Sequence, residues 1–490
     1  MNRNKLVLFG LVLGVLVLPS CSGLPGGNNG GVGGGGGGGG VQTTALTLTM
    51  ISQSQIRPGN FTILAWNAQI TSLSISDSTG NATNLALPET PLSVDLNRLS
   101  TDTLVLGAFP LPAATSFTSL TMAFSNFLIT IHNETGASIG NNCPNGAVCE
   151  FKPAPSTVTF TASIALTAGK TSNVYFTVFP SNIVTVSASG LSLVFTQNTP
   201  ISEQVAPRLG LPANTVDTVE DFTGVVTAVS SNSIAVKTGS GAAIATTLSG
   251  SVAIDDPLGL CNAVQKTVSA CAPVGSVVSI DGLVNTDGSI TTTEVDLLST
   301  TTVDSLEGTI FSTGAGSFAM VVTDKQVISN NATLTAANIG DIFVVTGLDA
   351  ATFSVDTKNL STANPAVPTD LFQSSGDILD GQTVRLHVTG ATGTEAAGNQ
   401  TLTTDIAQLR FTRFTANSST VSGTLFDVTD LGSFYQVANQ SVVQTYTGTT
   451  AFDGVTDISG VGNAVAPLVS VRALFLNSQD NFYATKVRHQ

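Results

Sequence analysis

The sequence predicts an all-β protein in which an N-terminal β-sandwich is followed by a row of small β-barrels. Threonine, serine and valine dominate the chain and charged residues make up only 10% of it, a composition that favours strands with hydroxyl-rich outer faces. Apolar residues occupy every second position in stretches such as TTALTLTMI from residue 43 and STVTFTASIALTA from residue 156, which is the period of a half-buried strand. In addition, the C-terminal half repeats one pattern of strands.

Composition and pattern divide the 490 residues into seven segments, and this length allows several domains. The predicted segments are a signal peptide (1–20), a lipidated cysteine with a flexible tether (21–41), the sandwich (42–200), a connector (201–220), and barrel repeats at 221–300, 301–416 and 417–490. The middle repeat contains an extra closing element, so we expect it to hold either an insertion or a degenerate additional copy.

The chain begins with the features of a signal peptide. Arg3 and Lys5 precede the uncharged apolar run LVLFGLVLGVLVL at residues 6–18. A membrane-spanning helix needs about 20 apolar residues, so this run is too short to span a bilayer and has the length of a signal-peptide core.

The run ends in LPSC, residues 18–21, which resembles the lipobox of bacterial lipoproteins, although Pro19 departs from its commonest pattern. The resemblance implies cleavage before Cys21 and acylation of that residue, and several acyl chains together make a stable anchor. Ser22 follows in place of the Asp that resembles an inner-membrane retention signal, so in a diderm bacterium the outer membrane is favoured. The alternative is an ordinary secretory signal with a chance cysteine.

Residues 22–40 are dominated by glycine and cannot bury enough apolar surface to offset the entropy of ordering. We therefore expect a flexible tether between the anchor and the folded chain, with a reach of about 25 Å.

The other cysteines form two local pairs, Cys143 with Cys149 in NNCPNGAVCEF and Cys261 with Cys271 in GLCNAVQKTVSACAPVG. An even number of remaining cysteines in an exported chain predicts disulfides. Zinc is the alternative, but neither pair has the CxxC spacing and no histidine lies near either pair.

About eight short strands separated by turns predict the sandwich in residues 42–200. The pieces ITSLSISDS, LSVDLNRL, GAFPLPAATSFTSLTMAF and IALTAGKTSNVYFTVFP together resemble an N-terminal domain of unknown function that is common in bacterial surface lipoproteins. This resemblance implies an architecture and no catalytic residues.

In the C-terminal half, three similar elements open the repeats: DFTGVVTAV at 221, SLEGTIFST at 305 and TVSGTLFDV at 420. Gly224, Gly308 and Gly423 occupy matching places in them and predict a bulge or sharp coil. A strand–turn–strand element closes each repeat, and a unit of roughly 75 residues with about five strands fits an OB-like barrel. These repeats resemble a bacterial family of unknown function that is often found in tandem behind a lipoprotein signal.

The sequence predicts no catalytic residue, no metal site and no cofactor. The three histidines, His132, His387 and His489, fall in three different regions, so a triad would require distant segments to converge. Trp66 lies on an alternating strand and is expected in the core, with a sugar-stacking platform as the alternative.

Two acidic stretches are candidates for calcium. NTDGSITTTEVD, residues 285–296, matches an EF-hand loop at several places, including Glu294. Leu283 stands where the first ligand belongs, however, and TDGS is a strong hairpin turn. Asp255 and Asp256 are expected to cap a turn.

The net charge of −15 repels phosphate backbones and argues against nucleic acid as a partner. We expect a non-catalytic, lipid-anchored protein of the cell envelope with a structural or adhesive role, whose partners are the membrane, through the lipid, and an envelope protein or polysaccharide. The alternatives are a module that binds glycan or protein, and a secreted hydrolase.

Overall fold

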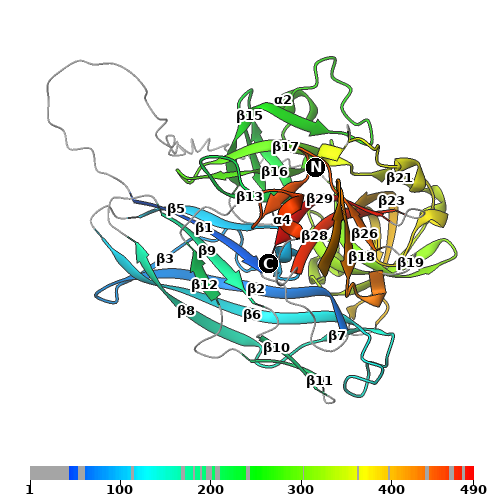
Figure 1. Cartoon of the computed structure of the whole chain (residues 1–490), viewed down its shortest axis with the longest axis horizontal. Coiled ribbons are helices and arrows are strands. Elements are labelled where there is room, and N and C mark those ends of the chain that lie inside the picture. The colour runs from blue at the N-terminus through cyan, green and yellow to red at the C-terminus, as the bar shows by residue number, and fades with distance from the viewer. Residues whose placement is uncertain are drawn as a thin grey trace, which may run out of the picture. The chain divides into compact units, whose positions relative to one another are not determined.

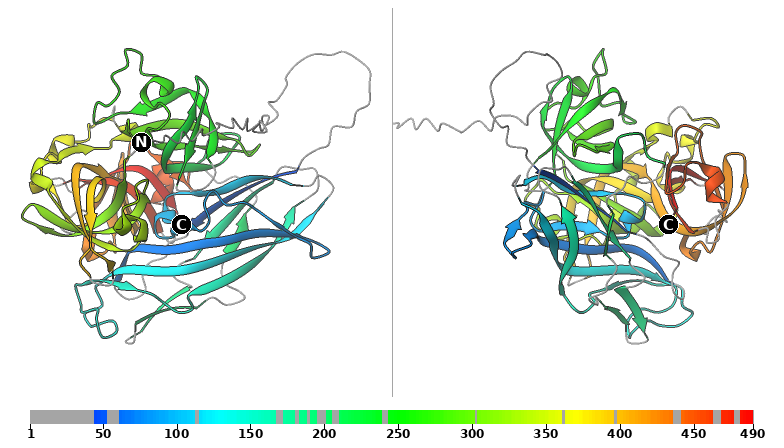
Figure 2. Two further views of the ribbon diagram at one scale, coloured as in Figure 1. Left: turned by 180° about the vertical axis from the view of Figure 1, so that it is seen from behind. Right: turned by 60° about the vertical axis from the view of Figure 1, so that its left-hand side comes forward.

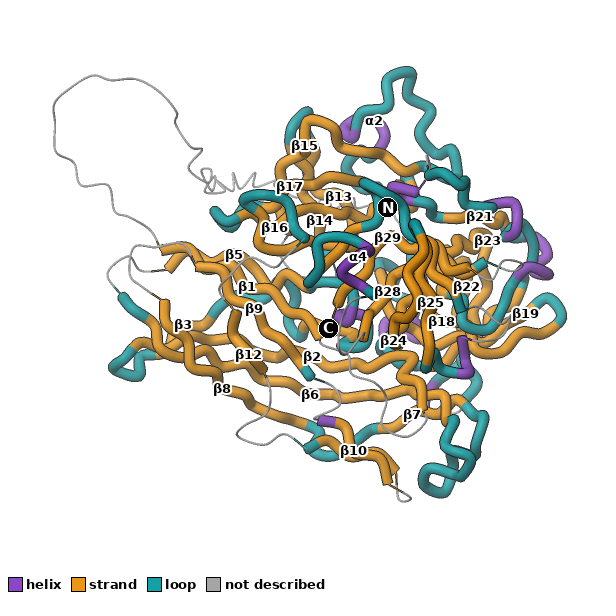
Figure 3. The backbone as a smooth tube through the Cα atoms, viewed as in Figure 1, coloured by secondary structure: helices purple, strands orange, loops and turns teal. Residues whose placement is uncertain are grey.

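The structure is a computed structural model (Figure 1). It describes residues 44–52, 61–111, 115–166, 172–179, 183–187, 190–194, 201–204, 210–238, 243–301, 303–360, 363–395, 398–435, 441–462, 468–476 and 481–489. The expected signal peptide, Cys21 and the tether lie outside these residues. The fold is all-β, as predicted: strands dominate the tube in Figure 3, and the described residues contain only three short α-helices, α2 (Val268–Cys271), α3 (Ala332–Ala336) and α4 (Ile458–Val461). None of the described helices is long and apolar enough to cross a membrane.

The N-terminal sandwich has two main sheets (Figure 2). One sheet has the order β12-β9-β1-β5, and its strands are β1 (Thr44–Ser52), β5 (Leu104–Leu111), β9 (Ser172–Val178) and β12 (Ile201–Gln204). The other is built on the long strands β2 (Phe61–Asp77) and β6 (Phe117–Asn133), and it also contains β3 (Ala82–Asn84), β4 (Leu92–Asp95), β7 (Val148–Phe151) and β8 (Thr157–Leu166). A separate hairpin joins β10 (Val184–Ser187) to β11 (Gly190–Leu193).

The alternation read from the sequence explains the core of the sandwich. Leu46, Leu48 and Met50 on β1 are completely buried, and they belong to one apolar cluster with Trp66 and Ile70 of the opposite sheet. Trp66 is 0% exposed, so the prediction of a core tryptophan is confirmed and a surface platform for sugar is excluded.

The first barrel closes in the order β13-β14-β15-β17-β16. Its strands are β13 (Thr215–Val229), β14 (Ser233–Lys237), β15 (Ile244–Asp255), β16 (Val277–Asn285) and β17 (Ile290–Ser299). All pairings are antiparallel except that of β15 with β17. This path is that of an OB-like barrel, in which the first strand contacts the second and the fourth, and the third contacts the fifth.

Two further barrels follow the same path with a third strand broken in two. The second contains β18 (Ser305–Gly314), β19 (Ser317–Gln326), β20 (Ile342–Thr346), β21 (Thr352–Val355), β22 (Thr383–Thr392) and β23 (Thr401–Arg410). The third contains β24 (Thr412–Ser422), β25 (Leu425–Thr429), β26 (Val442–Gln444), β27 (Ala451–Asp453), β28 (Leu468–Phe475) and β29 (Asn481–His489). The extra closing element of the middle repeat is therefore β20 with β21, which both pair with β23 in one sheet.

Two expected boundaries differ from the structure. The connector expected at 201–220 contains β12, which pairs with β9 of the sandwich, and the first residues of β13. The third barrel begins with β24 at Thr412, ahead of the expected residue 417. In both places the strand contains several polar residues. Its alternation of apolar residues is therefore incomplete, and its sequence resembles a linker.

The proposed equivalence of the three glycines is wrong for Gly423. Gly224 and Gly308 lie inside the first strand of their barrels, where a Cβ atom would collide with the backbone carbonyl oxygen of a residue on the second strand. Gly423 has φ of +63° and lies in the turn between β24 and β25, with open space beside it. The register places Phe414 at the position of Gly308. The sequence match therefore aligned a hairpin turn, which needs glycine for its positive φ, with a crowded strand.

Candidate functional site

The most conspicuous polar feature is a network of buried charges where the sandwich and the three barrels meet. At its centre is Asp221 of β13, whose side chain is 1% exposed. Five cationic side chains from the other three modules contact its carboxylate: Arg98 at 3.3 Å, Lys358 at 2.7 Å, Arg410 at 2.6 Å, Arg413 at 2.6 Å and Arg472 at 2.7 Å. We call Asp221, these five residues, Asp102, Glu307 and Arg385 the ionic network.

Strand alternation explains why these charges lie outside the barrels and are nevertheless buried. Arg385 on β22 stands between Val384 and Leu386, and both of these apolar residues are 0% exposed. Because successive side chains point to opposite faces of a strand, Arg385 points away from the interior of its own barrel. It is only 3% exposed because it meets Thr223 of the first barrel at 3.1 Å.

The second and third barrels each carry an outward-pointing arginine at the equivalent position of a strand. Arg385 pairs across the sheet with Glu307 on β18, and Arg472 of β28 pairs with Arg413 on β24. Glu307 accepts charge-assisted hydrogen bonds from Arg385, at 3.0 Å for the Nη2 atom. Each barrel thus turns one charged outer face toward the ionic network.

The electrostatics favour ionised carboxylates at the centre. Burial raises the pKa of Asp221, but attraction to Arg472, Lys358 and Arg410 outweighs burial and holds the pKa well below its usual range. Burial also raises the pKa of Glu307, and the cations Arg98 and Arg385 outweigh it and bring the pKa to about 2. Both carboxylates are therefore ionised at neutral pH.

The last strand extends the network toward the sandwich. Arg488 of β29, 0% exposed, bonds to Asp453 at 2.7 Å and donates to the carbonyl oxygens of Leu99 at 2.8 Å and Ser100 at 3.2 Å. Lys486 pairs with Glu220 at the start of the first barrel. Eight of the chain's 17 lysine and arginine side chains are held in such contacts, with none more than 11% exposed: Arg98, Lys358, Arg385, Arg410, Arg413, Arg472, Lys486 and Arg488.

A second group is rich in acids. We call Asp255, Asp281, Glu294, Asp296 and Asp356 the carboxylate cluster; the first four are in the first barrel and Asp356 follows β21 of the second. Lys358 reaches Asp281 at 2.9 Å and Asp296 at 3.1 Å. Burial, followed by repulsion from Asp296, raises the pKa of Glu294 to about 9, and burial raises that of Asp296 to about 6.

A cleft of about 720 Å³ lies beside the ionic network. Its walls come from the sandwich segment 88–105, from β13 and β14, and from β19 with the residues that follow it. Arg98, Asp102 and Asp221 of the network line it, and Phe222 is the only aromatic residue among its described lining residues. The cleft therefore combines aliphatic side chains with charged ones, and a flat apolar ligand has one ring against which to stack.

The predicted histidine positions remain separate. His132 of β6 lies 3.0 Å from Glu134 and its ring is 5.3 Å from that of Phe434. His387 of β22 lies 3.5 Å from Asp405, and His489 ends β29. No contact joins any two of the three histidines within the part of the chain that the structure describes.

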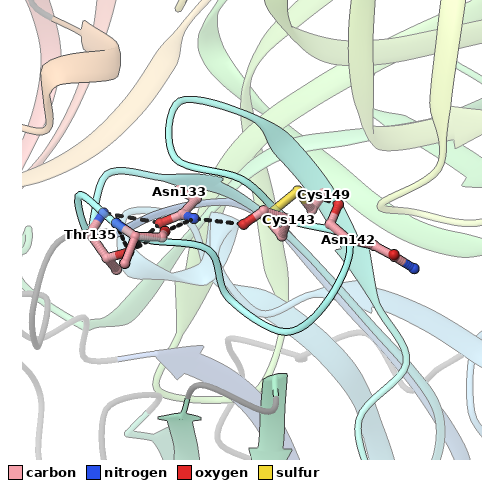
Figure 4. The surroundings of a disulfide bond; sticks show 6 residues. Asn133, Thr135, Asn142, Cys143 and Cys149 are labelled. Carbon is pink, nitrogen blue, oxygen red and sulfur yellow. Dashed lines mark hydrogen bonds between the residues drawn. A yellow bond between two sulfur atoms is a disulfide. The ribbon is translucent and has the colours of Figure 1, made fainter.

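The structure pairs the cysteines as disulfides, Cys143 with Cys149 and Cys261 with Cys271. In the first loop the side-chain amide of Asn133 donates to the carbonyl oxygen of Cys143 at 2.9 Å, and Thr135 donates to the Asn133 side chain (Figure 4). Polar side chains therefore hold the 143–149 loop in addition to its covalent bridge.

The two candidate calcium stretches form turns, with one exception. Asp287 accepts hydrogen bonds from Ser289 in the turn between β16 and β17, and Asp256 accepts hydrogen bonds from the backbone of Leu260 and Cys261, as predicted. Asp255 accepts a hydrogen bond from the backbone of Lys358 and joins the carboxylate cluster, because its neighbour across β15 and β17 is Asp296.

We expect removal of the first disulfide by Cys143→Ser with Cys149→Ser to lower the free energy of unfolding by about 2 kcal/mol, because the bridge closes a short loop. Urea unfolding of the variant and of the unreduced wild type measures the difference. The Cys261→Ser, Cys271→Ser variant is the matched control, with a slightly larger loss expected for its longer loop. A loss above about 4 kcal/mol would contradict this prediction, because it would exceed the stabilisation expected from closing the 143–149 loop alone.

Reasoning from the sequence missed the ionic network. Its signal is present in the closing strands, where Arg385 and Arg472 each stand between apolar residues and Arg488 follows Val487. Such a residue is normally read as facing solvent, and only the packing of one barrel on another buries it.

No protein-family model matches the chain, and no curated protein matches it.

Proposed function

We propose that the chain is a non-catalytic protein of the cell envelope, anchored by acyl chains on Cys21, and that its role is structural or adhesive. The observation that carries this proposal is the ionic network. Most of the buried cations contact carboxylates from other modules, so the charged side chains of the interior serve to hold four modules together. Four modules held together in this way suit a protein that presents surfaces to other envelope components.

Two further features support placement outside the cytoplasm. Disulfides persist in oxidising compartments and are rare in the cytosol, and the chain contains two of them. The LPSC motif and the glycine-rich segment supply an anchor and a tether, with Ser22 favouring the outer membrane.

We expect Cys21→Ser to abolish incorporation of labelled palmitate and to release the protein from the membrane fraction, because the thiol is the proposed site of acylation. Ser22→Asp is the matched control, since it should keep the label and move the protein to the inner membrane. Labelling of Cys21→Ser at the wild-type level would contradict the proposal.

The cleft favours a second candidate function, the binding of an envelope glycan or protein. Screening residues 42–490, the compact unit of the chain, against a glycan array and against envelope extracts tests it. A hydrolase is a third candidate, and turnover of a polysaccharide or peptide by the same purified protein would replace the structural proposal.

A further inference from the structure

The carboxylate cluster places acidic oxygens close together from two barrels. Asp255 and Asp296 are neighbours on the parallel strands β15 and β17, and Asp356 comes from the second barrel. One carboxylate oxygen from each of these three residues lies within 4.8 Å of the other two. Glu294 precedes Asp296 by two residues on β17 and so points to the same side of the sheet.

The environment of Glu294 distinguishes this cluster from an ordinary group of acidic residues. Glu294 is 7% exposed, yet no hydrogen bond or ion pair to it occurs among the described residues. The Oδ1 atom of Asp296 and the Oδ2 atom of Asp255 are also buried and accept no hydrogen bond from the described chain. Buried polar groups are normally satisfied, so these oxygens are arranged as free acceptors.

The nearby cations do not reach every member of the cluster. Lys358 is directed to Asp281 and to the Oδ2 atom of Asp296, and Arg410 is directed to Asp356 and, at 3.5 Å, to the same Oδ2 atom of Asp296. Both cations also pair with Asp221 of the ionic network. Arg472 also lies 3.8 Å from Asp281, so three cations with other partners serve five carboxylates, and none of them forms an ion pair with Asp255 or Glu294 among the described residues.

We propose that the carboxylate cluster binds a calcium ion between the first and second barrels, with ligands from Asp255, Glu294, Asp296 and Asp356. Calcium takes oxygen ligands at 2.3–2.6 Å, so two ligands on opposite sides of the ion lie about 5 Å apart, and the three aspartate oxygens fit within that span. Magnesium demands a near-ideal octahedron and usually keeps several waters, whereas calcium accepts irregular sets of carboxylates such as this one. Asp255 is partly exposed and provides access from solvent.

Titration calorimetry with calcium chloride on EDTA-treated protein tests the proposal. We expect one calcium ion per chain, and at least tenfold weaker binding in Asp255→Asn and in Glu294→Gln, because each variant removes one anionic ligand. Asp287→Asn is the matched control: it removes a carboxylate from a turn of the same barrel outside the cluster, and its affinity should equal that of the wild type.

Circular dichroism establishes that each variant is folded before titration, and thermal unfolding gives a second measure. Calcium should raise the melting temperature of the wild type and of Asp287→Asn, and should leave that of Asp255→Asn nearly unchanged. Absence of binding at millimolar calcium in the folded wild type would overturn the proposal, as would binding that both cluster variants retain. Equal affinity for magnesium would overturn the assignment to calcium.

Discussion

Replacing Asp221 with asparagine is expected to lower the free energy of unfolding by about 3 to 5 kcal/mol, the cost of removing one partner from a buried ion pair. Asp221 contacts five cations from three other modules, so its loss leaves several positive charges close together with less compensation. Asparagine isolates the charge, because Asp221 has φ of +52° and asparagine tolerates this left-handed conformation.

Two probes separate a global from a modular effect. Trp66, the only tryptophan, reports on the sandwich by fluorescence, and far-ultraviolet circular dichroism reports on all strands. In the wild type we expect both urea transitions to coincide; in Asp221→Asn the barrels should unfold at lower urea concentration than the sandwich. Asp405→Asn is the control, because Asp405 is 59% exposed and its pair with His387 is worth about 1 kcal/mol or less. A loss below 1 kcal/mol in Asp221→Asn would contradict the central role of this residue.

The second large effect is a maximum of stability in mildly acidic solution. Burial raises the pKa of Glu294 to about 9, and burial raises those of Asp296 and Asp95 to about 6. These groups hold a proton in the folded state at pH values where the unfolded chain has lost it, so stability falls as the pH rises from about 4 toward 9. Glu307 has its pKa brought to about 2, and its contribution is lost as the pH falls from about 4 toward 2.

Urea unfolding in EDTA at pH 3, 5, 6.5 and 8 measures this profile. We expect the free energy of unfolding at pH 5 to exceed that at pH 8 by at least about 3 kcal/mol, since each group protonated only in the folded state contributes about 1.4 kcal/mol per pH unit. Glu294→Gln should flatten the profile between pH 5 and 8, because glutamine does not titrate. Stability that increases steadily from pH 5 to 8 would contradict the assignment of protons to these buried carboxylates.

Local sequence pattern predicts much of the fold because strands are read from neighbouring residues. The alternation in TTALTLTMI places Leu46 and Met50 in the core, and the repeated closing elements mark the barrels. The glycine pattern misled at Gly423, because a turn and a crowded strand both favour glycine for different physical reasons. Local pattern thus identifies an element more securely than it identifies that element's place in a barrel.

The ionic network and the carboxylate cluster depend on contacts that no local pattern contains. Arg385 meets Thr223 across 162 residues and Arg472 meets Asp221 across 251 residues. The sequence shows that each arginine faces away from its own barrel, but which surface covers it depends on how whole barrels pack together. Likewise, Asp255 and Asp256 are indistinguishable as a pair of adjacent aspartates, and only the pairing of β15 with β17 separates their roles.

The position of Arg488 limits the order in which the parts of the chain can fold. This residue lies on the final strand and bonds to Leu99, 389 positions earlier, while β29 also pairs with β26, β27 and β28 to complete the third barrel. The sandwich cannot acquire these contacts until residues 481–489 have been synthesised. Contacts of such long sequence separation form slowly, so the attachment of the last strand to the first module is expected to be a late step in folding.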